Sequence, residues 1–147
     1  MIEKINLLGA ITAVAYFMSM ILIFVFRLLG KPEYGQWLGF VQAVIAIPLV
    51  GYLLFTARQL ERSKLYNIQV SLMLAFLLVE LLLDYILKID FRQVRWMVIC
   101  YVTFFFSATG GMIGVAGYAG QGWTISAIIL FLIMAISAFV QRAVTGI

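Results

Sequence analysis

The sequence predicts an all-α protein, a polytopic membrane helix bundle with five transmembrane helices joined by short loops. Of its 147 residues, 65% are hydrophobic and only 11% are charged, whereas about a quarter of the residues in soluble globular proteins are charged. The uncharged stretches are also long enough, because about 20 apolar residues at about 1.5 Å each cross the hydrocarbon core. We therefore expect the whole chain, 1–147, to form a single transmembrane domain.

The first predicted helix covers about residues 5–29. It carries no charge before Arg27, and Gly30, Lys31 and Pro32 then favour a turn that ends it. Because the stretch lacks a basic leader and a small-residue cleavage site, we expect a retained helix rather than a cleaved signal peptide.

The next two helices are predicted at about residues 35–58 and 65–88. Trp37 marks the start of the second helix, because tryptophan is typical of the membrane interface. This helix ends in a polar, partly basic run. The third carries no charge before Lys88 except Glu80 and Asp84, and it stops where several charged residues follow. Its two acidic residues are the main candidates for chemistry.

The last two helices come from one uncharged stretch, residues 96–141. As a single helix this stretch would be about 69 Å long, against a hydrocarbon thickness of about 30 Å, so it must turn back. The glycine-rich segment 117–122 is the expected hinge, which gives helices at about 94–117 and 123–142. An alternative is that this segment re-enters the membrane as a half-helix, which requires cover from protein or a water-filled cavity.

The basic residues lie at predicted helix ends and in loops, as is usual in membrane proteins, so the net charge of +4 does not indicate nucleic-acid binding. With five spans the termini lie on opposite sides, which we call side A (N-terminus) and side B (C-terminus). The positive-inside rule favours a cytoplasmic side B by a thin margin. Side A holds Lys4, Arg58, Arg62 and Lys64, and side B holds Arg27, Lys31, Lys88, Arg92, Arg95 and Arg142.

Several classes of site are excluded by composition. The chain has no histidine and one cysteine, Cys100, so disulfide frameworks, haem ligation by histidine and histidine-based zinc sites are ruled out. We expect no metal site and no cofactor. An enzyme that uses Glu80 and Asp84 as acid and base is the weakest hypothesis, because no nucleophile or oxyanion donor accompanies them.

The acidic pair is the strongest candidate for function. Glu80 lies near the midpoint of the third helix, where an ionised carboxylate costs about 2.5 to 3.5 kcal/mol. The first, third and fifth helices run in the same direction, so Arg27 and Arg142 approach side B together with Asp84. We predict that these four residues bind an ion, a proton or a small ligand. The alternative is that they form ion pairs that only fix helix register.

Small residues and one proline mark the predicted packing sites. Gly110 and Gly114 form a GxxxG pair in the fourth helix, which allows another helix to approach closely. Pro48 removes a backbone hydrogen bond in the second helix and is the candidate hinge, either a shape adjustment or a gate. The full predicted packing face comprises Gly110, Gly111, Gly114 and Gly117.

Two functional hypotheses remain open. The first is a small transporter, ion-coupled carrier or channel subunit whose acidic pair binds a cation or proton. The second is a structural or accessory subunit that packs against partner membrane helices or a second copy of itself. Both place the chain in a lipid bilayer as a multi-pass protein, which in a bacterium would be the cell or inner membrane. A solvent-connected pocket at Glu80 would favour the first hypothesis, and a dry, salt-bridged pair the second.

Overall fold

The computed structural model describes residues 2–86 and 94–145, and this part of the chain is all helical. Five of its helices are long and apolar enough to cross a membrane, which confirms the predicted helical bundle of a multi-pass membrane protein. The helices are α1 (Ile2–Leu28), α2 (Pro32–Gln59), α3 (Lys64–Glu80) with its π-helical continuation η1 (Leu81–Ile86), α4 (Arg95–Gly117) and α5 (Gln121–Thr145).

The helix ends follow local chemistry. Gly30 takes a positive φ of 76° in the turn after α1, and Pro32 occupies the first turn of α2, where its missing N–H would have no helical partner. Ser63 caps α3, its hydroxyl accepting a hydrogen bond from the Tyr66 backbone N–H at 3.3 Å. The predicted bounds are close, but the third helix changes to π geometry after Glu80, and residues 87 and 88 lie outside the described residues.

The glycine-rich segment between the last two helices is a short turn and not a half-helix. α4 ends at Gly117 and α5 begins at Gln121, and Gly120 between them has a φ of 142° that favours glycine. The hinge interpretation is therefore correct, and the re-entrant alternative is wrong.

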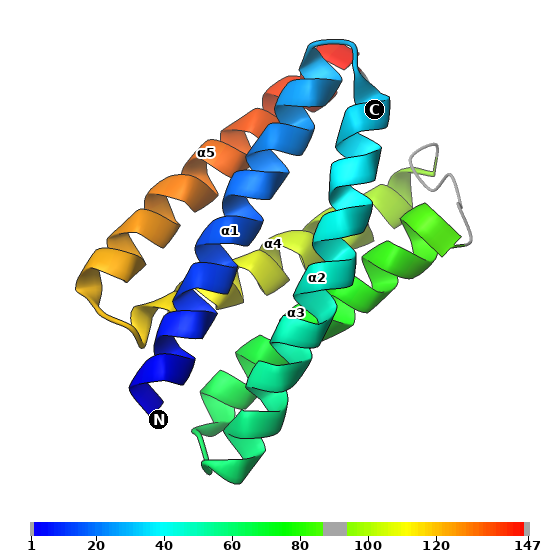
Figure 1. Ribbon diagram of the computed structural model, residues 1–147. Coiled ribbons are helices and arrows are strands. Elements are labelled where there is room, and N and C mark those ends of the chain that lie inside the picture. The colour runs from blue at the N-terminus through cyan, green and yellow to red at the C-terminus, as the bar shows by residue number, and fades with distance from the viewer. Residues whose placement is uncertain (1, 87–93, 146–147) are drawn as a thin grey trace.

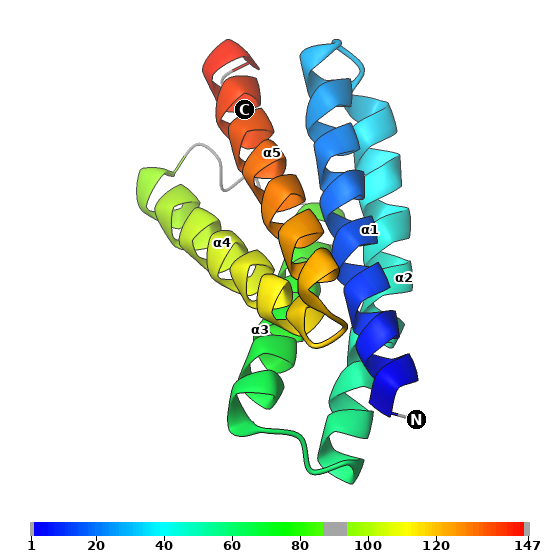
Figure 2. The same cartoon turned by 90° about the vertical axis from the view of Figure 1, so that its left-hand side faces the viewer.

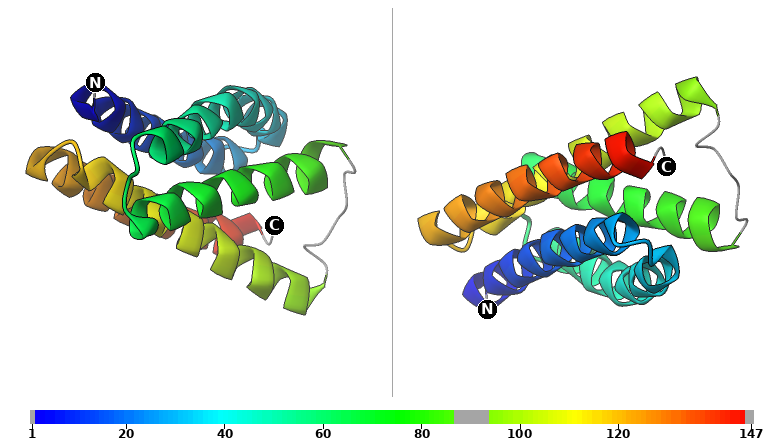
Figure 3. Two further views of the ribbon diagram at one scale, coloured as in Figure 1. Left: turned by 90° about the horizontal axis from the view of Figure 1, so that it is seen from below. Right: turned by 90° about the horizontal axis from the view of Figure 1, so that it is seen from above.

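The helices alternate in direction, with the N-terminus at one end of the bundle and the C-terminus at the other (Figure 1). α1 packs against α2, α4 and α5, while α3 packs against α2 and α4. Within the described residues α3 makes no contact with α5. Seen from below, α3 lies between α2 and α4 (Figure 3).

The core is built around α1. Half of its most apolar window is buried, 50% against 11% for α5, so α5 is the outermost helix and presents most of its surface to the bilayer. Large side chains fill the interior, and Phe17, Leu53, Phe76 and Met112 are all buried. Because lipid is as apolar as these side chains, the hydrophobic effect does not hold the helices together. Their association depends instead on the close van der Waals packing of these side chains.

Two of the four predicted packing glycines, Gly111 and Gly114, face Gln69 of α3. A Cβ on Gly114 would collide with the Gln69 side chain, and one on Gly111 would lie 3.6 Å from the Gln69 backbone. A Cβ on Gly110 would meet nothing within 4 Å among the described residues, and one on Gly117 would meet only the Thr124 hydroxyl at 3.0 Å. Within the described chain Gly110 meets no other helix, so its packing role stays a prediction.

On side A, Arg62 fastens four segments to one another. Its guanidinium lies 4.1 Å from the ring centroid of Tyr66 and 5.0 Å from that of Tyr118, and it donates a hydrogen bond to Asn6 Oδ1 at 2.7 Å. The Ser63 hydroxyl lies 3.3 Å from that of Tyr118. This Arg62 cluster ties α1, the α2–α3 loop, α3 and the α4–α5 turn together.

Pro48 is exposed and α2 continues through it as far as Gln59. Six residues earlier, Gln42 is buried and its amide donates a hydrogen bond to the Tyr16 carbonyl of α1 at 3.2 Å. That bond ties α2 to α1 on the side B half of the bundle. The hinge role of Pro48 stays a prediction.

Candidate functional site

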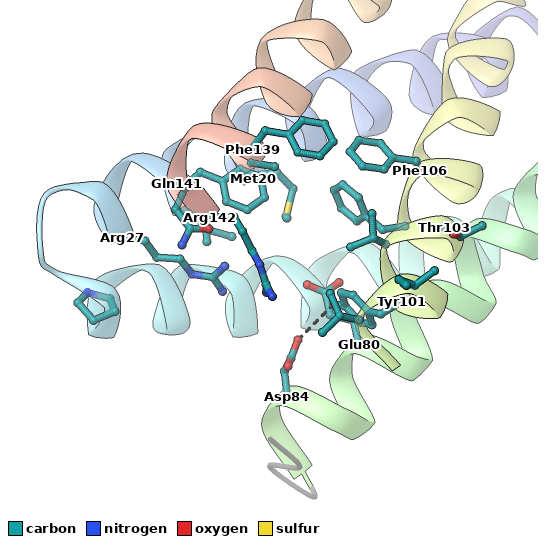
Figure 4. Close-up of a pocket in the computed structure, with 18 of the residues that line it drawn as sticks. Met20, Arg27, Glu80, Asp84, Tyr101, Thr103, Phe106, Phe139, Gln141 and Arg142 are labelled. Carbon is teal, nitrogen blue, oxygen red and sulfur yellow. Dashed lines mark hydrogen bonds between the residues drawn. The ribbon is translucent and has the colours of Figure 1, made fainter. Parts of the chain in front are cut away.

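A cavity of about 620 Å³ occupies the side B half of the bundle. Its volume lies in the range of about 300 to 1,000 Å³ that is usual for small-ligand sites. The end of α1, the start of α2, the junction of α3 with η1, the start of α4 and the end of α5 all contribute to its wall (Figure 4). The polar and charged residues in that wall are Arg27, Gln36, Glu80, Asp84, Tyr101, Thr103, Gln141 and Arg142.

The cavity exists because the helices separate toward side B. α4 and α5 leave their common turn and diverge from each other, as Figure 2 shows. Phe105 and Phe106 line the end of the cavity toward the bilayer centre. Behind them, Phe76 packs against Phe105 and Phe131 packs against Phe106, with ring centroids 5.4 and 5.9 Å apart. Phe131 in turn makes a 6.1 Å edge contact with Phe17. The cavity therefore has an apolar floor and a polar rim.

Glu80 is the buried charged residue of the site, with 6% of its surface exposed. It ends the α-helical part of α3, on the same buried face as Met73, Phe76 and Leu77. A carboxylate removed from water needs a counterion, a proton or hydrogen-bond donors, because an isolated buried charge costs several kcal/mol. The cavity beside Glu80 gives a ligand or water access to that carboxyl group.

Asp84 follows in η1 and is half-buried. In a regular α-helix Glu80 and Asp84, four residues apart, would lie on one face, but the π-helix changes the spacing and turns Asp84 to a different angle. There it accepts a hydrogen bond from the Tyr101 hydroxyl of α4 at 3.3 Å. Short π-helical segments occur frequently at functional sites.

The two arginines face the acidic wall from the other side of the cavity. Arg27 ends α1 and its guanidinium lies 5.8 Å from the ring centroid of Phe24, while Arg142 is an exposed residue in the last turn of α5. Figure 4 shows both side chains pointing into the cavity toward Glu80 and Asp84. All four residues singled out from the sequence thus line one cavity.

Some of the site was not found from the sequence. Tyr101 and Gln141 also line the cavity, and Gln141 is only 2% exposed. The position of Gln141 beside Arg142 in an apolar helix was an available signal, whereas nothing in the uncharged stretch around Tyr101 set it apart. Of the other side B cations, Arg95 is exposed and does not line the cavity, and Lys88 and Arg92 lie outside the described residues.

Two further features bear on the chemistry of the site. Neither Pro48 nor Val44, whose carbonyl the proline frees, is part of the cavity wall. Within residues 2–86 and 94–145, no three acidic, histidine or cysteine residues group closely enough to hold a metal ion. The cavity instead offers two carboxyl groups, two guanidinium groups and two primary amides.

Comparisons of the chain with protein-family models, with curated proteins and with solved structures find no match. The function is therefore argued from the geometry of the cavity.

Proposed function

We propose that this small multi-pass membrane protein is a transport protein that binds its ligand in the side B cavity, with Glu80 as the site of a coupled proton or cation. One observation carries the proposal: a carboxyl group that is 6% exposed lines a cavity of about 620 Å³, which Asp84, Arg27 and Arg142 also line. Ionisable residues inside membrane spans commonly mark substrate or ion pathways.

The energetics of burial explain why Glu80 suits this role. Uptake of a proton or a cation removes the cost of an ionised carboxylate at this depth, and release of it restores that cost. The free energy of ligand binding can therefore be coupled to the charge state of Glu80. Arg27 and Arg142 on the opposite wall favour the ionised form and would help to expel the proton or cation.

The accessory-subunit hypothesis explains the cavity less well. If the charges served only helix register, the acidic pair would lie in a dry and fully packed interior. A cavity within the size range of ligand sites, with two primary amides, a phenol and two guanidinium groups in its wall, favours ligand binding.

The test is the Glu80→Gln variant, reconstituted as the full chain in liposomes. The variant keeps the shape of the side chain but carries no charge and accepts no proton. We expect it to lose proton uptake and ion flux that the unaltered protein shows under an imposed pH or cation gradient. Glu61→Gln is the matched control, since Glu61 is an exposed residue in the side A loop. Equal flux through the unaltered protein and Glu80→Gln would refute the proposal.

A further inference from the structure

We propose that the ligand of the side B cavity is a membrane amphiphile with a zwitterionic head, held with its tail toward the bilayer centre. This inference rests on the ligand-binding function proposed above and names the class of ligand. It follows from three features of the cavity: its side opening to the lipid, its division into an apolar and a charged zone, and the balance of charges in its wall.

The cavity is open toward the hydrocarbon between α4 and α5. Ile99, Val102 and Phe139 line it and are nevertheless 56%, 37% and 63% exposed. All three lie inside the apolar spans of these helices, and Val102 is about 10 Å along the axis from the first residue of α4. At that depth the surroundings are lipid, so an apolar chain has a direct path into the cavity.

The wall is divided along the membrane normal. On α1 the lining begins with Met20 and Ile23 and ends with Arg27, about 10 Å closer to side B. On α5 it likewise passes from Ala138 to Arg142. On these two helices apolar groups lie toward the bilayer centre and charged groups toward its surface, which is the order of tail and head in a lipid of the side B leaflet.

The charges favour a head that carries both signs. Arg27 and Arg142 supply two positive charges on one wall, and Glu80 and Asp84 supply two negative charges on the other when both are ionised. An ammonium group suits the carboxylates, and a phosphate or carboxylate suits the guanidinium groups, each through charge-assisted hydrogen bonds. A head with a single charge would meet oppositely charged groups on one wall only.

The test measures binding to the purified full chain in an amphipathic polymer, so that no micelles compete. Four probes are compared by calorimetry below their micelle concentrations: dodecylphosphocholine, dodecyl maltoside, dodecyl sulfate and dodecyltrimethylammonium. We expect dodecylphosphocholine to bind about tenfold more tightly than dodecyl maltoside. Arg142→Gln and Asp84→Asn should each remove most of this difference, since each deletes the partner of one charge on the head.

A steric variant tests whether the binding takes place in the cavity. Ala138→Phe fills part of the cavity and should abolish binding of dodecylphosphocholine, while Ala75→Phe, on an exposed face of α3 outside the cavity, should not. Glycerophosphocholine, which has the head but no tail, should bind at least tenfold more weakly than dodecylphosphocholine. Equal binding of these two would show a water-soluble ligand and overturn the inference.

The remaining outcomes separate this inference from the proposed transport function. Equal affinities for dodecylphosphocholine and dodecyl maltoside, or tighter binding of either singly charged probe, would overturn the zwitterionic assignment even if Glu80→Gln abolishes ion flux. A clear zwitterion preference that is lost in Ala138→Phe supports the ligand class even if Glu80→Gln leaves ion flux unchanged, in which case only the transport role fails.

Discussion

The two ends of the bundle use arginine in opposite ways. On side A, Arg62 is enclosed by Tyr66, Tyr118 and Asn6, and the segments that supply these residues are drawn together. On side B, Arg27 and Arg142 lie in the wall of a cavity where the helices have separated. The difference shows that the position of a basic residue at a helix end does not by itself determine whether it stabilises the fold or lines a cavity. What decides its role is whether the neighbouring helices converge around it.

Glycine contributes to the same difference. Gly111 and Gly114 let α3 lie close to α4 around Gln69, toward side A. Toward side B the same two helices meet through larger side chains instead: Phe76 packs against Phe105, and Tyr101 reaches Asp84 along the cavity wall. We therefore expect substitutions on side A to change mainly stability and substitutions on side B to change mainly ligand binding.

The largest expected effect on stability comes from Gly114→Leu. The leucine must displace the Gln69 side chain from the surface of α4, and overpacking of this kind costs about 1 to 3 kcal/mol. Unfolding of the purified protein, followed by circular dichroism, should show a clear fall in the melting temperature. Gly110→Leu is the control and should unfold nearly as the unaltered protein does, because a side chain there meets open space. If the melting temperature of Gly110→Leu fell as far as that of Gly114→Leu, the described packing of α4 against α3 at Gly114 would be contradicted.

For Arg62→Ala we expect a smaller fall in the free energy of unfolding, of about 1 to 2 kcal/mol. The substitution removes the contacts of the guanidinium with two tyrosine rings and its hydrogen bond to Asn6. Chemical denaturation in detergent measures the change. Arg58→Ala serves as the control, since Arg58 is an exposed basic residue on the same side of the membrane. Should the two variants be equally stable, the Arg62 cluster would not be what holds side A closed.

The smallest effect on stability is expected for Tyr101→Phe in the cavity wall. It deletes a single hydrogen bond to Asp84, and the net contribution of one such bond is about 0.5 to 1.5 kcal/mol. On the proposed function the same variant should weaken ligand binding, because Asp84 loses the group that orients it. Tyr52→Phe on the exposed face of α2 is the matched control. Unchanged ligand affinity in Tyr101→Phe would remove Asp84 from the binding site.

Much of the fold was predictable because the bilayer imposes strong constraints on a sequence. Long uncharged stretches, the turn after Arg27 and the glycine-rich segment before Gln121 predicted five spans and their directions. Those directions were sufficient to bring Arg27, Asp84 and Arg142 to the same end. The ligand-binding role of these residues stays a prediction.

Helix rotation and local geometry could not be predicted in the same way. Gly110 and Gly111 are adjacent in sequence, and only the rotation of α4 about its axis decides that Gly111 faces α3. The π-helix after Glu80 has the sequence LLLDYI, in which no residue distinguishes it from an ordinary α-helical segment. Tyr101 is a cavity residue only because α4 is rotated to face the end of α3.

The central claim is that the cavity beside Glu80 is reached from side B, and one labelling experiment tests it directly. Ala138→Cys is introduced into a Cys100→Ser background, and the protein in sealed vesicles is treated with a charged, membrane-impermeant thiol reagent from each side. Ala75→Cys, on the exposed face of α3, is the lipid-facing control. We predict that Ala138→Cys is labelled from side B alone and that Ala75→Cys is not labelled. Labelling of Ala138→Cys no faster than the control from either side would contradict the account.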